Sequence, residues 1–258
     1  MSDLLQAAMI GLVAGYLSGQ FGVGGGIVTT PAIRLLLDRP ELVAVGTPLP
    51  VIIPTAIAGA IAYARRGLID VRVGVSVGII GAGFAVLGAW ATELVGGRVV
   101  LLVTAALIAW MAVDMALLAL TSAVSADARQ ARAARSASAL KIALLGIGAG
   151  LYSGFLGLGG GFVVVPVLVR HFGFGMKRAI GTSLVVVSIL AVPGSITHYL
   201  LGNVEVGLAL GLALGVVPGA LLGARVTARA QEKNVRLAFA GLLVAVGAVL
   251  ALSELGVF

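Results

Sequence analysis

The chain has 258 residues, of which 60% are hydrophobic and only 10% are charged, and its formal net charge is +7. A soluble domain carries about a quarter charged residues, so this composition excludes a water-soluble globular fold and predicts a polytopic membrane protein. Cysteine is absent, which excludes disulfides and cysteine metal sites. The basic residues lie in short loops between apolar runs, where they indicate membrane orientation rather than nucleic-acid binding.

In chain order, the first half begins with an apolar run, a glycine-rich turn and a short apolar run, and three long apolar runs follow. These five runs cover residues 4–21, 27–37, 43–64, 71–92 and 99–120. The second half repeats the order at residues 140–156, 162–172, 179–201, 206–224 and 235–252. Only helices and closed barrels satisfy the backbone inside a bilayer, and the absence of period-two alternation excludes a barrel. We therefore expect an all-α fold.

The lengths of the runs predict two kinds of helix. A run of about 20 residues crosses about 30 Å of hydrocarbon as a helix, whereas a run of about eleven residues crosses about half of it. We therefore interpret each glycine turn with its flanking runs as a broken or re-entrant hairpin, with the turn inside the membrane thickness. The expected fold has about ten helical segments, including the short ones.

The chain contains one unit twice. GLVAGYLSGQFGVGGGIVTTP at residues 11–31 recurs as GIGAGLYSGFLGLGGGFVVVP at residues 146–166, an offset of 146 − 11 = 135 residues. We predict a single transmembrane transporter domain with a first repeat at 1–121, a linker at 122–139 and a second repeat at 140–258. An internal repeat in so apolar a chain is typical of transporters built from two structural halves.

Positive charge predicts how the two repeats are oriented. Lys and Arg cluster in the loops around 65–72 and 170–178, in the central linker and around 225–236. By the positive-inside rule these four loops are cytoplasmic, so both termini of this multi-pass membrane protein are predicted to face outward. The basic loops occupy different positions in the two repeats, which predicts inverted-topology repeats.

Glycine triplets open the second, short run of each hairpin. The free N–H groups of a helix's first turn, with its partial positive charge and no side chain to block approach, form an anion site. The alternative is a tight turn that only reverses the chain. The glycines spaced by three or four residues ahead of each triplet are typical of close helix packing. The substrate-binding candidates are Gly24, Gly25, Gly26, Gly159, Gly160 and Gly161.

Hydroxyl side chains follow the hairpins at equivalent positions. Gly46-Thr47-Pro48 and Gly181-Thr182-Ser183 begin the next run of each half. Thr47, Thr182 and Ser183 are therefore further candidates for substrate binding, since each hydroxyl can donate to an anion's oxygen. The alternative is that these hydroxyls bond back to a carbonyl of their own helix.

Three titratable or charged residues within the apolar runs are candidates for gating or coupling, namely Arg34, Asp114 and His198. An intramembrane carboxylate such as Asp114 is a functional hypothesis by default, for example in proton coupling, and the alternative is a shallow acid that reaches the basic cytoplasmic face. Arg34 either holds an anion bidentately or snorkels to the interface. His198 is either a pH-sensitive gate or a polar residue at the interface.

No pattern of residues typical of catalysis, metal binding or nucleotide binding occurs in the chain, and the GxGGG strings do not open a βαβ unit. We therefore expect no enzyme, no catalytic residue, no metal and no cofactor.

The motif G-x-x-x-G-x-x-S-G-x-x-G-x-G-G-G-x-x-x-x-P, present twice, with the GT-P and GTS elements after it, resembles the TauE/SafE family of sulfite and organosulfonate exporters. The resemblance covers nearly the whole chain except the linker. It implies a bacterial inner-membrane transporter of small sulfur-containing anions such as sulfite, sulfoacetate or related sulfonates, and in such a membrane the outward-facing termini are predicted to be periplasmic.

We therefore expect a secondary transporter, an exporter of such anions, that works by alternating access. The alternatives are an anion channel and a membrane subunit that supports a partner complex. The expected partners are a small anionic substrate and the lipid bilayer, with the proton as a candidate coupling ion and a homodimer as a candidate assembly. No nucleic acid is expected.

Overall fold

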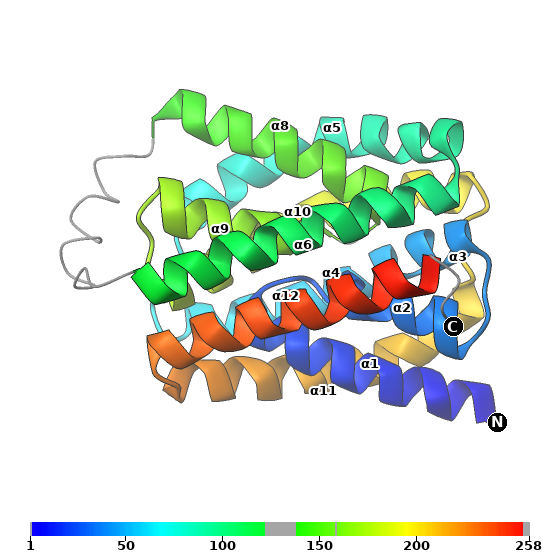
Figure 1. Ribbon diagram of the computed structural model, residues 1–258, viewed down its shortest axis with the longest axis horizontal. Coiled ribbons are helices and arrows are strands. Elements are labelled where there is room, and N and C mark those ends of the chain that lie inside the picture. The colour runs from blue at the N-terminus through cyan, green and yellow to red at the C-terminus, as the bar shows by residue number, and fades with distance from the viewer. Residues whose placement is uncertain (1, 122–137, 158, 255–258) are drawn as a thin grey trace.

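The computed structural model describes residues 2–121, 138–157 and 159–254, and within these residues the fold is entirely helical (Figure 1). The first-half helices are α1 (Ser2–Phe21), α2 (Gly26–Leu36), α3 (Glu41–Gly46), α4 (Pro48–Ala64), α5 (Val71–Val95) and α6 (Gly97–Thr121). The second-half helices are α8 (Ala139–Leu156), α9 (Gly161–His171), α10 (Met176–Leu200), α11 (Val206–Arg229) and α12 (Glu232–Glu254).

Seven of the described segments are long and apolar enough to cross a membrane, while α2 and α9 are shorter apolar helices. This confirms the predicted all-α, multi-pass membrane fold. The helix bounds agree with the predicted runs to within a few residues. One predicted run is broken, because α3 ends at Gly46 and α4 begins at Pro48. Proline lacks an N–H group, so it fits the first position of a helix better than its interior. Counted as the single span Glu41–Ala64, α3 and α4 leave ten segments, as expected.

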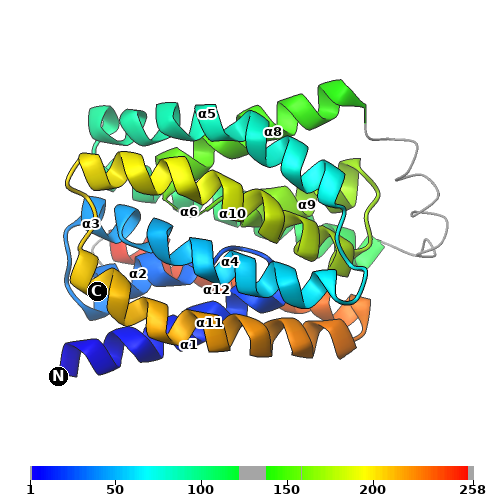
Figure 2. The ribbon, with the colours of Figure 1, turned by 180° about the vertical axis from the view of Figure 1, so that it is seen from behind.

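The two short helices belong to hairpins that enter the bundle from opposite ends. Helix α1 begins and α2 ends at one end, whereas α8 begins and α9 ends at the other (Figures 1 and 2). The start of α1 and the end of α12 lie at the same end. The α4–α5, α9–α10 and α11–α12 loops lie at the opposite one (Figure 2). The predicted linker lies almost wholly outside the described residues.

Glycine allows the long helices of the two halves to pack at backbone distance. A Cβ atom added to Gly19 of α1 would lie 2.0 Å from the Ala220 carbonyl oxygen of α11, and one added to Gly154 of α8 would lie 1.9 Å from the Ala85 carbonyl oxygen of α5. Such approaches are open only to a residue without a side chain. The prediction that the spaced glycines pack helices is therefore confirmed, and the packing joins α1 to the second half and α8 to the first.

Candidate functional site

The two glycine turns meet inside the bundle. A Cβ atom on Gly161, the first residue of α9, would lie 2.0 Å from the carbonyl oxygen of Gly22, at the end of α1. The backbones of the two hairpins are therefore in direct contact. The structure brings together the two triplets that the sequence singled out, although they lie 135 residues apart.

Two apolar side chains fill the space beside both turns. Ile52 of α4 and Val187 of α10 are the nearest side chains to the Cβ positions of both Gly24 and Gly159. Both are fully or almost fully buried, at 1% and 0% exposure. Residues 52 and 187 are themselves 135 apart, so each half contributes one side chain to this central pair.

Each glycine turn ends in a left-handed residue that starts a short helix. Gly25 has φ 93° and caps α2, and Gly160 has φ 91° and caps α9. Residues with a side chain rarely adopt this conformation, which explains the glycine. The amides of Val28 and Thr29 already bond to the Gly25 carbonyl, so the amides before them have no acceptor within the helix. Each turn therefore presents donors and the positive end of a helix dipole.

Buried hydroxyls beside these helix starts were not among the site residues predicted from the sequence. Ser18 and Ser153 are 0% exposed, and neither hydroxyl has a hydrogen-bond partner among the described residues. The Ser18 Cβ lies 3.8 Å from the Cβ position of Gly25, and the Ser153 Cβ lies 3.5 Å from that of Gly160. The available signal was their recurrence at the same offset, within the repeated motif.

A third such hydroxyl belongs to Tyr152, whose oxygen lies 3.1 Å from the Cβ position of Gly160. No described residue makes a hydrogen bond of ordinary geometry with this oxygen, and the amides of Val163 and Val164 donate instead to the Gly160 carbonyl oxygen at 3.3 Å. The ring packs edge-on against Phe162, with 5.6 Å between ring centroids. The first half has Leu17 at the equivalent position.

The hydroxyls of Thr47 and Thr182 hold loops of the opposite half. Thr47 accepts a hydrogen bond from the Glu205 amide at 3.0 Å, and Thr182 accepts one from the Asp70 amide at 2.9 Å. Both threonines are fully buried, and neither is recorded bonding back to its own helix. The predicted role of their hydroxyls in substrate binding stays a prediction.

The glycine before each threonine makes room for the same loop. A Cβ on Gly46 would lie 2.4 Å from the Asn203 carbonyl oxygen, and one on Gly181 would lie 2.3 Å from the Leu68 carbonyl oxygen. In each Gly-Thr pair, the glycine therefore leaves room for the loop, and the threonine hydroxyl accepts a hydrogen bond from it. This contact explains both residue types in the doubled motif.

An arginine adds an ion pair between the halves at each of these points. Arg39 lies 2.9 Å from the Glu205 carboxylate, and Arg178 lies 2.8 Å from that of Asp70. We call the first group, Gly46, Thr47, Arg39 and Glu205, the α11 clamp, and the second group, Gly181, Thr182, Arg178 and Asp70, the α5 clamp. Asp70 and Glu205 cap the N-termini of α5 and α11. These two helix starts lie at opposite ends of the bundle (Figure 2).

Ser183 reaches the first glycine turn from the second half. Its hydroxyl lies 2.8 Å from the Gly22 carbonyl oxygen and 2.9 Å from that of Ile180, to which it donates. It therefore lies at the predicted site, where it supports the backbone of the turn.

His198 is fully buried rather than exposed at an interface. Its Nε2 lies 3.0 Å from the Gly154 carbonyl oxygen. Tyr63, at the equivalent position of the first half, donates to the Gly19 carbonyl oxygen at 3.0 Å. The two side chains thus make the same contact with the helix that leads into the glycine turn.

Arg34 and Asp114 lie away from the turns. Arg34 is in the last turn of α2 and pairs with Glu41 at 2.8 Å. Asp114 pairs with Arg170 in the last turn of α9. A helix of this length places its last turn about 12 Å from its first, so neither ion pair touches a glycine triplet. Their role in gating or coupling stays a prediction.

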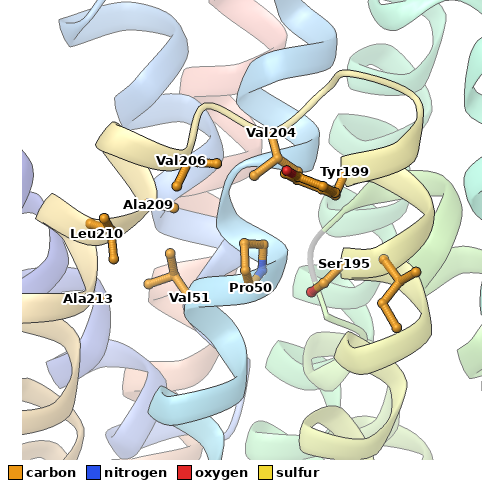
Figure 3. Close-up of a pocket in the computed structure, with 10 residues that line it drawn as sticks. Pro50, Val51, Ser195, Tyr199, Val204, Val206, Ala209, Leu210 and Ala213 are labelled. Carbon is orange, nitrogen blue, oxygen red and sulfur yellow. The ribbon is translucent and has the colours of Figure 1, made fainter.

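Two surface cavities flank the start of α11. One of about 390 Å³ lies between α4, α10 and α11 (Figure 3). Its lining is apolar except at Ser195, whose hydroxyl donates to its own helix, and at the hydroxyl of Tyr199, so it offers an anion no positive charge. The other, of about 400 Å³, is lined by residues of α1, the α2–α3 loop and α11, including Arg39 and Glu205 of the α11 clamp. This second cavity leads to a contact between the halves.

Comparison with known proteins agrees with this architecture. The Sulfite exporter TauE/SafE family matches residues 7–250. A probable membrane transporter protein of Bacillus subtilis, YunE, is 28% identical over 93% of this chain and 94% of its own. A probable membrane transporter protein of Haemophilus influenzae is 30% identical over 77% of this chain and 75% of its own, and one of Methanocaldococcus jannaschii is 24% identical over 93% and 92%. No solved structure matches the chain significantly.

Proposed function

This chain belongs to the TauE/SafE sulfite exporter family and is a membrane transporter, and we propose that it moves a small sulfur-containing oxyanion, sulfite or an organosulfonate, by alternating access. The observation that carries this proposal is the meeting of two glycine turns at the centre of the bundle, each opening a short helix. Helix starts with free amides bind anions. An oxyanion with several acceptor oxygens suits a site that offers several donors.

The electrostatics of the described residues favour an anion over a cation. The carboxylates of Glu41, Asp70, Asp114, Glu205 and Glu232 are all paired with arginines. None of these pairs involves a glycine turn, whereas the turns carry the positive ends of α2 and α9. A substrate held between the turns therefore meets donors and no compensating negative charge.

The two clamps supply the proposed gates. Each joins the halves at one end of the bundle through a threonine–amide hydrogen bond at equivalent positions and an arginine–carboxylate ion pair. Opening one clamp while the other stays closed gives access to the central turns from one side only, which is the requirement of alternating access. Ile52 and Val187 then separate from the turns on the opening side.

The proposed topology is an inverted repeat. The hairpins enter from opposite ends (Figures 1 and 2), which supports equivalent segments running in opposite directions across the membrane. The end that carries the basic α4–α5, α9–α10 and α11–α12 loops then faces the cytoplasm, and the end at which α1 begins and α12 ends faces the periplasm.

Flux through purified protein in liposomes tests the proposal. Vesicles loaded with labelled sulfite or sulfoacetate are expected to release it with saturable kinetics, faster when unlabelled anion is present outside, because a carrier exchanges substrate in both directions. Flux that rises linearly with concentration would instead indicate a channel. No flux of any sulfur anion would contradict the proposed substrate class, and flux only with a partner added would indicate a subunit role.

A further inference from the structure

We propose that the two glycine turns are unequal, and that the oxyanion group of the substrate binds at the N-terminus of α9, where the hydroxyls of Ser153 and Tyr152 donate to it. This inference rests on the proposed function and adds to it the residues that hold the substrate and the half in which they lie.

The first support is that two buried hydroxyl groups beside one helix start have no hydrogen-bond partner among the described residues. Ser153 is 0% exposed, and the hydroxyls of Ser153 and Tyr152 have no partner among the described residues. A buried polar group without a hydrogen bond is costly, and native proteins keep one where it serves a ligand or a mechanism. Both side chains lie beside the start of α9, because the Tyr152 oxygen is 3.1 Å and the Ser153 Cβ 3.5 Å from the Cβ position of Gly160.

The second support is the chemistry of the helix start itself. Gly160 caps α9 in the left-handed conformation. The Val163 and Val164 amides donate to its carbonyl oxygen, so only the amides before them have no acceptor within the helix. An oxyanion at this helix start accepts hydrogen bonds from those free amides and from the Tyr152 hydroxyl, whose oxygen lies 3.1 Å from the Cβ position of Gly160. A hydrogen bond to a charged acceptor is about twice as strong as one between neutral groups.

The third support is the difference between the halves. At the α2 start, Ser18 is equivalent to Ser153, but Leu17 stands in place of Tyr152. The first turn therefore has one hydroxyl where the second has two. Thr30 is also buried without a partner among the described residues, but it lies a full turn beyond the start of α2. Two donors from side chains select an anion with at least two acceptor oxygens, such as a sulfonate or sulfite, over chloride.

The test measures sulfite and sulfoacetate affinity of the purified protein by calorimetry, together with its thermal midpoint without anion. We expect Ser153→Ala and Tyr152→Phe each to weaken binding about tenfold or more, the loss of one hydrogen bond to a charged group. Tyr152→Phe keeps the ring against Phe162. The repeat-matched control Ser18→Ala and the control Thr30→Val are expected to bind like the wild type.

The thermal midpoint separates a binding role from a structural one. Because the Ser153 hydroxyl has no partner to lose, Ser153→Ala is expected to leave the midpoint unchanged or to raise it. A lower midpoint with unchanged affinity would overturn the inference, and so would an equal loss of affinity in Ser18→Ala. If the wild type transports sulfur anions while all four variants bind them normally, the α9 subsite is wrong and the proposed function stands. A wild type that binds and transports no oxyanion contradicts both.

Discussion

Gly161 and Gly22 touch through their backbones, so closely that a methyl group on Gly161 would lie 2.0 Å from the Gly22 carbonyl oxygen. One residue opens the short helix of the second hairpin, and the other follows the long helix of the first. The contact places the two helix starts of the proposed anion site beside each other. Its tightness makes it directly testable.

Gly161→Ala is expected to lower the thermal midpoint and to reduce anion binding. The added methyl meets a backbone atom, which cannot move aside as a side chain can, and overpacking of this kind typically costs about 1–3 kcal/mol. The matched control is Gly83→Ala in α5, whose Cβ position has no atom within 4 Å. If both variants show the same midpoint and affinity as the wild type, the turns do not meet as described.

Glycine packing between α1 and α11 predicts a second stability effect. A Cβ on Gly15 would lie 2.3 Å from the Val216 carbonyl oxygen, so Gly15→Ala must push the two helices apart. Gly148→Ala on α8 meets nothing within 4 Å and should be neutral or slightly stabilising, since alanine favours helix by about 1 kcal/mol over glycine. Thermal unfolding in detergent compares the two, and equal midpoints would argue against the close helix pair.

Thr182→Val tests the α5 clamp at nearly constant side-chain volume. The substitution leaves the Asp70 amide without its acceptor, and a buried donor left unpaired costs about 1–3 kcal/mol. Thr104→Val is the control, because the Thr104 hydroxyl bonds only to Val100 of its own helix and its loss leaves no backbone group unpaired. The thermal midpoint should fall in the first variant and hardly change in the second. The reverse order would contradict the clamp.

The ion pairs of the clamps predict which side of the protein opens. The chain has no cysteine, so Val187→Cys provides a single label beside the turns. In this Val187→Cys background, Arg178→Ala should raise labelling by an impermeant maleimide added at the α5-clamp side. Arg39→Ala should raise labelling from the α11-clamp side. We expect each increase to be several-fold relative to Val187→Cys alone.

Arg34→Ala is the matched control for this experiment. It removes an ion pair of similar length, 2.8 Å, whose two partners lie in the same half. It also removes a hydrogen bond to the Arg39 carbonyl oxygen, but it leaves the Arg39–Glu205 ion pair in place. Labelling should therefore stay at the level of the Val187→Cys background. An increase from the same side in both clamp variants would show that the clamps do not gate opposite ends.

The helices could be predicted from the sequence because each depends on local composition. Runs such as 71–92 and 206–224 are almost entirely apolar and bounded by charged residues, and the structure has α5 and α11 there. The break at Thr47 was missed because it depends on a single residue, Pro48, within an apolar run.

The partners of the Gly-Thr pairs lay beyond sequence reasoning. Thr47 bonds to a residue 158 positions away, and nothing local indicates that a loop of the other half needs an acceptor there. The same holds for Tyr152. In the sequence it is an ordinary aromatic residue of an apolar helix, and only the structure places its hydroxyl beside Gly160. The glycine triplets were recognisable because the doubled motif marks them.

The most direct test of the central claim is thermal stabilisation of the purified protein by a panel of anions, comprising sulfite, sulfoacetate, taurine, thiosulfate, phosphate and chloride. A ligand that binds the folded state raises its stability by mass action. We predict saturable stabilisation by a sulfur oxyanion and its loss in Gly160→Val, because valine cannot adopt the left-handed cap of α9. Folded wild-type protein that responds to no sulfur anion, or a Gly160→Val variant stabilised like the wild type, would contradict an anion site at the glycine turns.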